Sequence, residues 1–294
     1  MPRLGLTVTE EQAGRTVLSL LRGELGLSST LVKRLKRTEL GLLLNGAPVH
    51  TDARPRAGDR LEADLSAAER PAGVEPVEMA LDILFEDEHL LIINKPAPLA
   101  VIPSSLSPGE PTLAGGVVRY LGPGAPFHPV NRLDRGTTGL MAVAKTGYIH
   151  DRLRRQLHGG GFARTYLAVC ADAPEPAEGV IDLPIGRAPG SAVKRQVSPG
   201  GRPALTRYRV LGRRGCWSLV ELRPQTGRTH QLRVHMAAVG CPLAGDWLYG
   251  TEDRARIPRP ALHACRLVLA HPVSGEGLDL TAPLPADMKR LWER

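Results

Sequence analysis

Apolar residues recur at the spacing of an α-helix in two short stretches near the N-terminus. In the first stretch, residues 9–26, the apolar stripe is made of Ala13, Val17, Leu20 and Leu21. Thr9 and Gln12 fit a capping box, which predicts that this helix begins close to Thr9. A second short helix is predicted to begin at Ser28, because serine is a preferred N-cap residue.

Strand signals follow these two helices. Asn45 and Gly46 form a dipeptide that is typical of a tight hairpin turn. In residues 58–65, apolar and polar positions alternate as they do in a half-buried strand. We therefore expect residues 1–66 to form a small α/β domain in which two helices precede a small sheet. Residues 67–78 are rich in alanine, proline and glutamate and are predicted to be a linker.

Predicted strands outnumber predicted helices in residues 79–294, which we expect to form a second domain. The strands are expected in residues 81–96 (two strands around a polar turn), 139–146, 163–171, 204–212, 216–224 and 264–272. One helix is expected in residues 149–161, which end in glycines. Another is expected in residues 229–240, with Thr229 as N-cap and Gly240 as stop. This pattern favours an α+β fold around a mostly antiparallel sheet.

The charge of the chain indicates a polyanionic partner. The 294 residues carry a formal net charge of +8, and the pI is near 9.7. Only six of the 38 basic residues are lysines, which leaves 32 arginines. Because arginine suits bidentate phosphate contacts, nucleic acid is the first candidate, although a GC-rich genome also favours arginine. Aromatic residues make up only 4% of the chain, so aromatic stacking cannot dominate a binding surface.

The cysteines and the apolar runs indicate a soluble protein of a reducing compartment. The four cysteines lie far apart without a C-x-x-C pair, which favours buried thiols and argues against a zinc site. No apolar run approaches the roughly 18 residues of a membrane span. The N-terminus lacks the apolar core of a signal peptide. We therefore expect a cytoplasmic protein that has no membrane partner and acts as a monomer.

Several familiar chemistries have no matching motif. The chain has no G-x-S-x-G nucleophile elbow and no phosphate-binding P-loop motif. His230 and His235 are five residues apart on a predicted helix, a spacing that does not place two ligands on one face. We expect neither a metal nor a cofactor.

A cluster of four cations marks the second predicted helix. Its members are Lys33, Arg34, Lys36 and Arg37. Such a run can be a solvated helix face, but four positive charges within five positions can equally contact RNA phosphates. The helix pair, the stretch "LVKRLKRTELGLLLNG" and the closing "AGDRLE" resemble the S4 RNA-binding domain. The resemblance implies that residues 1–66 bind RNA.

The stretch "PVNRLDRGTTGL", residues 129–140, places Asp134 between Arg132 and Arg135. Alone, this pattern fits an ordinary surface salt bridge. It occurs, however, in a fixed series of motifs: "NKP" at 94–96, "RLDRGTTGLMAVAKT" at 132–146, "TYLA" at 165–168, "GRPALTRYRVL" at 201–211, "ELRPQTGRTHQLRVHMAAVGCPLAGDWLYG" at 221–250 and "LHACRL" at 262–267. Together these motifs resemble the RluA family of RNA pseudouridine synthases over roughly residues 79–290. The resemblance implies a mixed, mostly antiparallel pseudouridine synthase domain in residues 79–294.

The resemblance also implies an active site. It identifies Asp134 as the catalytic aspartate, Arg233 as the cation that pairs with it, and Tyr166 as a tyrosine that packs on the base. Arg132 corresponds to the arginine that fills the space left by a flipped nucleotide. The reaction suits these residue types: the bond between ribose C1′ and uracil N1 breaks, the base turns, and C5 takes the place of N1. No atom is gained or lost, so no cofactor is needed. The carboxylate can attack, remove a proton from the sugar or stabilise a cationic ribose.

One position departs from the family pattern. The family usually has histidine before R-L-D, whereas this chain has Asn131, which can hydrogen-bond but does not titrate near neutral pH. The substrate implied by the resemblance is a specific uridine in RNA, in the first place large-subunit ribosomal RNA. Two alternatives remain at this stage: a tRNA pseudouridine synthase of the same family, and a non-catalytic RNA-binding factor in ribosome assembly.

Overall fold

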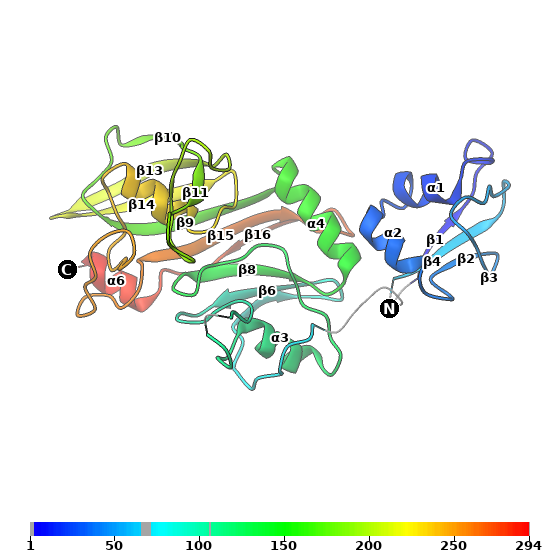
Figure 1. The fold of residues 1–294 in the computed structure, drawn as a ribbon, viewed down its shortest axis with the longest axis horizontal. Coiled ribbons are helices and arrows are strands. Elements are labelled where there is room, and N and C mark those ends of the chain that lie inside the picture. The colour runs from blue at the N-terminus through cyan, green and yellow to red at the C-terminus, as the bar shows by residue number, and fades with distance from the viewer. Residues whose placement is uncertain (1–2, 66–71, 106, 294) are drawn as a thin grey trace.

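The computed structural model describes residues 3–65, 72–105 and 107–293, and these residues form two separate β-sheet units (Figure 1). A four-stranded sheet lies at the N-terminal end of the molecule. A ten-stranded sheet forms most of the rest, and a two-stranded ribbon accompanies it. None of the helices in the described ranges is long and apolar enough to cross a membrane.

The N-terminal unit combines the four-stranded sheet with two short helices. Its elements are β1 (Arg3–Thr7), α1 (Val17–Gly23), α2 (Ser29–Leu35), β2 (Leu42–Leu44), β3 (Ala47–Pro48) and β4 (Arg60–Asp64). The sheet order is β1-β4-β2-β3, and every pair is antiparallel. Asn45 and Gly46 have φ angles of 53° and 83° and form the predicted hairpin turn between β2 and β3. Strand β1 was not predicted, so the sheet does not simply follow the helices.

The two helices differ in how well their starts were predicted. Helix α2 begins after Ser28, whose side chain accepts a hydrogen bond from the Leu31 amide, as predicted. Helix α1 begins only at Val17, with Thr16 as its N-cap. Gln12 does accept a hydrogen bond from the Thr9 amide at 3.0 Å, but Gly14 then adopts a φ of 77°. The capping box at Thr9 therefore closes a turn, and the predicted start of the helix was wrong.

The large sheet has the order β10-β13-β14-β9-β15-β8-β6-β5, with β16 beside β15 and β7 beside β8. Its strands are β5 (Ile83–Glu86), β6 (Leu90–Lys95), β7 (His128–Pro129), β8 (Thr138–Ala144), β9 (Phe162–Ala171), β10 (Glu178–Asp182), β13 (Leu205–Arg214), β14 (Trp217–Pro224), β15 (Leu262–Ala270) and β16 (Gly277–Thr281). Among the described strands, only β8 and β15 pair in parallel. The predicted α+β class with a mostly antiparallel mixed sheet is confirmed.

Four helices and the ribbon accompany the large sheet. They are α3 (Leu113–Leu121), α4 (Gly147–Gly159), α5 (Gln231–Ala238) and α6 (Ala286–Glu293), with the ribbon strands β11 (Ile185–Arg187) and β12 (Arg195–Val197). Helix α4 was predicted, and Gly160 caps it in the left-handed conformation. Helix α5 was also predicted, but its N-cap is His230 and not Thr229. Helices α3 and α6 were not predicted.

Three neighbouring strands at the centre of the sheet set the position of the functional site. Across them, Tyr166 on β9 pairs with Ala264 on β15, and Ala264 pairs with Gly139 on β8. A Cβ on Gly139 would lie 2.3 Å from the Ala264 carbonyl oxygen, and the φ of Gly139 is 111°. Only glycine allows this close approach. The row places the start of β8 one strand away from Tyr166.

The two units touch at α4. The Arg155 guanidinium donates a hydrogen bond of 2.7 Å to the Gly26 carbonyl of the N-terminal unit. Residues 66–71, which include most of the predicted linker's first half, lie outside the described residues. Toward the end of the predicted linker, the Val77 amide already donates to the Gly115 carbonyl of α3. This part of the segment therefore packs on the large unit.

Candidate active site

Asp134 lies in the loop that joins β7 to β8 at the centre of the large sheet. The Thr137 amide donates to the Asp134 carbonyl at 3.0 Å and closes a turn around it. The neighbouring Leu133 is buried in the core. The Asp134 side chain keeps 28% of its surface exposed, which leaves its carboxylate open to a ligand.

Asn131 anchors the start of this loop to the sheet. It is buried, its Oδ1 accepts from the Ala142 amide at 2.9 Å, and its Nδ2 donates to the Leu140 carbonyl. Both partners belong to β8. The side chain thus satisfies two backbone groups that burial would otherwise leave unpaired.

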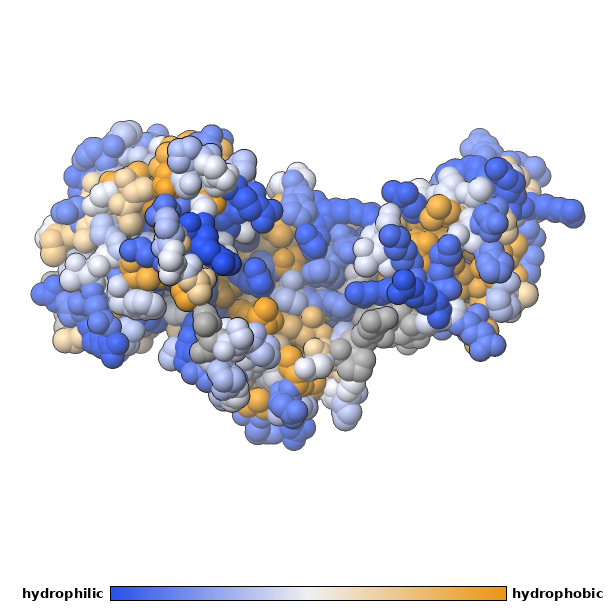
Figure 2. Space-filling model, viewed as in Figure 1, coloured by the Kyte–Doolittle hydropathy of each residue, from blue (hydrophilic) through white to orange (hydrophobic). Residues whose placement is uncertain are grey.

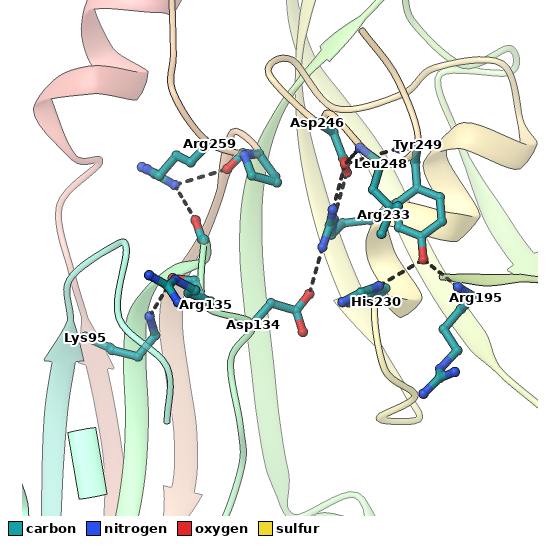
Figure 3. A network of polar contacts seen from close by, with 12 residues as sticks. Lys95, Asp134, Arg135, Arg195, His230, Arg233, Asp246, Leu248, Tyr249 and Arg259 are labelled. Carbon is teal, nitrogen blue, oxygen red and sulfur yellow. Dashed lines mark hydrogen bonds and ion pairs between the residues drawn. The ribbon is translucent and has the colours of Figure 1, made fainter. Parts of the chain in front are cut away.

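Two buried basic side chains hold the same loop from behind (Figure 3). Lys95 donates to the carbonyls of Pro96 and Leu99 at 2.8 Å each and to that of Arg135 at 3.4 Å. Burial, together with the nearby Arg259, lowers the pKa of Lys95 to about 7, while Asp134 opposes the shift. Lys95 therefore lies within electrostatic reach of Asp134.

Arg259 connects the loop to the C-terminal helix α6. Its Nη1 donates to the Gly136 carbonyl at 3.2 Å, and its Nε and Nη2 bind the Asp287 carboxylate at 2.7 and 2.8 Å. The carboxylate balances the buried guanidinium, and the pKa of Asp287 is lowered because the hydrogen bonds and charge of Arg259 outweigh burial. The backbone around Asp134 is thus fixed by groups from two distant parts of the chain, Lys95 and Arg259.

Arg233 faces Asp134 from helix α5. Its Nη1 lies 3.7 Å from Oδ2 of Asp134, and only 7% of its side chain is exposed. Its Nε and Nη2 donate to the fully buried Asp246 carboxylate at 2.7 Å each. Burial opposes the charge of Arg233, but Asp246 and, beyond it, Asp134 raise the pKa of the guanidinium. Arg233 therefore stays charged between two carboxylates.

Tyr249 completes this side of the site. The Cζ atom of Arg233 lies 5.0 Å from the centre of its ring, a cation–π distance. The Tyr249 hydroxyl accepts a hydrogen bond from the Arg195 amide at 2.8 Å and lies 2.9 Å from Nδ1 of His230. In Figure 3 these contacts form one continuous network with Arg233 and Asp246.

Tyr166 lies on β9 with its ring buried and 6% of its surface exposed. It shares an apolar cluster with Leu133 and Leu232, which flank Asp134 and Arg233 in the sequence. Burial raises the pKa of its hydroxyl, Arg164 opposes this, and Asp134 adds to it. Among the described residues none hydrogen-bonds the hydroxyl, which leaves it available to a ligand.

The remaining predicted RNA-contact residues are on the surface. Arg132 is exposed and makes no ion pair or hydrogen bond with the part of the chain that the structure describes. In the N-terminal unit, Lys33, Lys36 and Arg37 are exposed and Arg34 is partly exposed. Lys36, Arg37 and His50 line a hollow of about 420 Å³. Hydrophilic residues cover most of this unit on the face shown in Figure 2.

Comparison with known proteins gives a consistent result. Residues 89–238 match the family model described as RNA pseudouridylate synthase. That segment holds Asp134, Tyr166 and Arg233. The chain belongs to the RNA pseudouridylate synthase family. It is therefore an enzyme, an isomerase that acts on RNA.

Relatives of this family match nearly the whole chain. The chain is 39% identical to "Uncharacterized RNA pseudouridine synthase YjbO" of Bacillus subtilis, over 92% of this chain and 95% of the relative. It is 38% identical to "Ribosomal large subunit pseudouridine synthase D" of Escherichia coli K12, over 86% of this chain and 82% of the relative. The human "RNA Pseudouridylate Synthase Domain Containing 4" has a similar structure, with a TM-score of 0.57, 29% identity, and coverage of 71% of this chain and 92% of that one.

Within this pseudouridine synthase, sequence reasoning missed four residues of the site: Asp246, Tyr249, Lys95 and Arg259. Asp246 and Tyr249 lie in the motif at 221–250, where an acid and a tyrosine three residues apart could have been noticed. Lys95 lies in "NKP", where a lysine at the end of an apolar strand could also have been noticed as a candidate site residue. Arg259 lies in none of the motifs. In the described ranges no group of three or more potential ligand side chains could hold a metal ion.

Proposed function

We propose that this pseudouridine synthase converts a specific uridine of large-subunit ribosomal RNA to pseudouridine, with Asp134 as its catalytic carboxylate. The observation that carries the proposal is the pairing of Asp134 and Arg233. A partly exposed carboxylate lies 3.7 Å from a buried guanidinium, in a loop whose backbone is held from behind by Lys95 and Arg259. A carboxylate is thus presented to a ligand beside a buried guanidinium.

The chemistry needs such a carboxylate. As the C1′–N1 bond breaks, positive charge develops on the ribose, and Asp134 either bonds to it, stabilises it or removes a proton from it. Arg233 places a buried positive charge 3.7 Å from the Asp134 carboxylate. Tyr166 contributes a buried aromatic ring with a hydroxyl that no described residue hydrogen-bonds, which suits contact with the uracil. Asp134, Arg233 and Tyr166 are the proposed catalytic residues.

Base flipping is part of the proposal. The C1′–N1 bond is inaccessible in a stacked helix, so the uridine must leave the stack. Arg132 is two residues from Asp134, exposed and without a protein partner among the described residues, which suits a side chain that occupies the vacated space. Its planar guanidinium can stack on the neighbouring bases.

The N-terminal unit is proposed to be an S4-like RNA-binding domain within residues 1–66, followed by a linker at 67–78 and the catalytic domain at 79–294. The support is the exposed cation cluster on α2, namely Lys33, Arg34, Lys36 and Arg37, on a unit with its own sheet. These cations make no ion pair within the described ranges and remain available for phosphates.

The name of the Escherichia coli relative supports ribosomal RNA of the large subunit as the substrate. A relative of the same name from Zymomonas mobilis is 36% identical over the whole of this chain. We propose further that the protein acts as a monomer in the cytoplasm. The four cysteines are all free thiols, as in a reducing compartment.

The experiment that tests this function maps pseudouridines. Large-subunit ribosomal RNA and tRNA, both isolated from cells that lack the gene, are incubated with the protein and mapped at nucleotide resolution. The proposal predicts a new pseudouridine at a defined position of the large-subunit RNA. New pseudouridine only in tRNA would refute the substrate, and none in either RNA would refute the enzyme's proposed action on them.

A further inference from the structure

His230 has an unusual backbone and a side chain that does not cap its helix. It precedes α5 with φ 58° and ψ 17°, in the left-handed region that disfavours residues other than glycine. An N-cap residue would normally turn its side chain back to the helix amides, but His230 makes no such bond. Its ring instead contacts Tyr249. Strain of this kind persists where the surrounding structure holds a residue in place, and it concentrates at functional sites.

The contacts of Tyr249 determine which ring nitrogen of His230 carries a proton. The Tyr249 oxygen already accepts the Arg195 amide hydrogen at 2.8 Å. Its own hydroxyl hydrogen has one acceptor among the described residues, Nδ1 of His230 at 2.9 Å. We assign the hydroxyl hydrogen to this contact, which satisfies both donors and leaves Nδ1 unprotonated. In a neutral imidazole the hydrogen is then on Nε2.

The ring is neutral at ordinary pH. Burial lowers the pKa of His230, and it outweighs the opposing pull of Asp134. The charged groups around the ring are Asp134, Arg233, Asp246 and Arg195, two of each sign. The imidazole thus offers one N–H donor and is not a second cation beside Arg233.

Nε2 of His230 is open to a ligand. No described residue hydrogen-bonds it. It is also not one of the buried, unpaired side-chain polar atoms of the described residues, which are Arg164 Nε and Arg195 Nη1. In Figure 3 the His230 ring and the Asp134 carboxylate both lie below Arg233, and Asp134 is close enough to influence the imidazole electrostatically. A donor of fixed direction therefore faces the place where the proposed reaction occurs.

We propose that Nε2–H of His230 binds a carbonyl oxygen of the flipped uracil and stabilises the negative charge that forms on the base. This inference rests on the proposed function, in which Asp134 acts on the ribose of that nucleotide. When the C1′–N1 bond breaks, the bonding electron pair stays on the uracil and is shared by N1, O2 and O4. A preorganised donor at one of these oxygens is stronger in the transition state than in the ground state. Tyr249 is the positioning residue that fixes the ring.

The test uses single-turnover rates on a short RNA that contains the uridine identified by mapping, with enzyme in excess. His230→Ala should lower the rate about 100-fold, the effect of removing one such donor, with RNA affinity unchanged. His230→Gln places an amide N–H close to the position of Nε2 and should restore most of the rate. His230→Asn, which tolerates the left-handed backbone but reaches only the position of Nδ1, should not restore it. Thr229→Ala, a change at the exposed neighbour, is the control and should retain the wild-type rate.

Uridine analogues in which sulfur replaces one carbonyl oxygen identify the oxygen that His230 binds. Either 2-thiouridine or 4-thiouridine at the target should slow the wild-type enzyme, because sulfur is a poorer acceptor, and the same substitution should have little effect on His230→Ala. A wild-type rate for His230→Ala, equal rates for the Gln and Asn variants, or equal thio effects in wild type and His230→Ala would each overturn the inference. If wild type makes no pseudouridine, the proposed function itself fails, which is a distinct result.

Discussion

Arg233 is bound by Asp246 through two hydrogen bonds of 2.7 Å. The closer partner of this arginine is thus not Asp134, which lies 3.7 Å away, but a carboxylate with no exposed surface. Asp246 fixes the plane of the guanidinium and leaves Nη1 pointed at Asp134 (Figure 3). Arg233 is therefore shared, and Asp134 keeps the character of an available anion.

Removing Asp246 should damage both stability and catalysis. Asp246→Asn leaves a buried guanidinium with one distant counter-charge, and breaking a buried pair in this way costs about 3–5 kcal/mol. We expect the free energy of unfolding to fall by an amount of this order in urea denaturation. Glu252→Gln, a change at an exposed acid on the same segment, should have almost no effect. Equal stabilities of the two variants would contradict the role given to Asp246.

Lys95 predicts a particular dependence of stability on pH. Its pKa is about 7 in the folded protein and about 10.5 when unfolded, so between these values the unfolded chain binds the extra proton. Stability from this group therefore rises with pH, by up to about 1.4 kcal/mol per unit for one proton. The free energies of unfolding of wild type and Lys95→Met should diverge from pH 7.5 to 9 in favour of wild type. Parallel pH profiles would show that Lys95 does not titrate in this range.

Asn131 should be important for its hydrogen bonds and not for proton transfer. Asn131→Ala leaves the buried Ala142 amide without an acceptor, at a cost of about 1–3 kcal/mol of stability. Asn131→His can accept the same hydrogen bond through a ring nitrogen and should retain substantial activity. A loss beyond about a hundredfold in Asn131→His, roughly 3 kcal/mol of barrier, with folding intact would indicate a direct part in the reaction.

The cation cluster on α2 should bind RNA through phosphates. Replacing Lys33, Arg34, Lys36 and Arg37 by alanine should weaken RNA binding. It should also reduce the log–log salt slope by up to about three or four, since each phosphate contact releases about one counterion. Turnover at saturating RNA should change little.

A control variant with the same loss of charge distinguishes the cluster from net charge alone. It replaces four exposed cations of the large unit: Arg119, Arg254, Arg256 and Lys289. If both variants lower affinity and slope equally, the α2 cluster is only a solvated face.

The sequence predicted the parts of the fold and of the site that depend on local pattern. The hairpin turn at Asn45, helix α4 and the central strands follow from residue spacing, and the motifs led to Asp134 and Arg233. Asp246, Lys95 and Arg259 were missed because their roles depend on contacts between distant elements, such as that of Arg259 with α6. The left-handed His230 was missed because nothing local requires it. Its conformation is maintained by tertiary contacts.

Asp134→Asn tests whether Asp134 performs the reaction. This variant keeps the shape of the side chain and removes its charge. The measurement is pseudouridine yield under single-turnover conditions, with enzyme in excess over RNA, alongside RNA affinity for each variant. We expect no pseudouridine from Asp134→Asn with RNA binding retained, because affinity depends mainly on phosphate contacts elsewhere. Arg233→Ala should also lose most of its activity. The two losses should not add in the double variant, since Asp134 and Arg233 act together. Clear residual activity in Asp134→Asn would contradict the account.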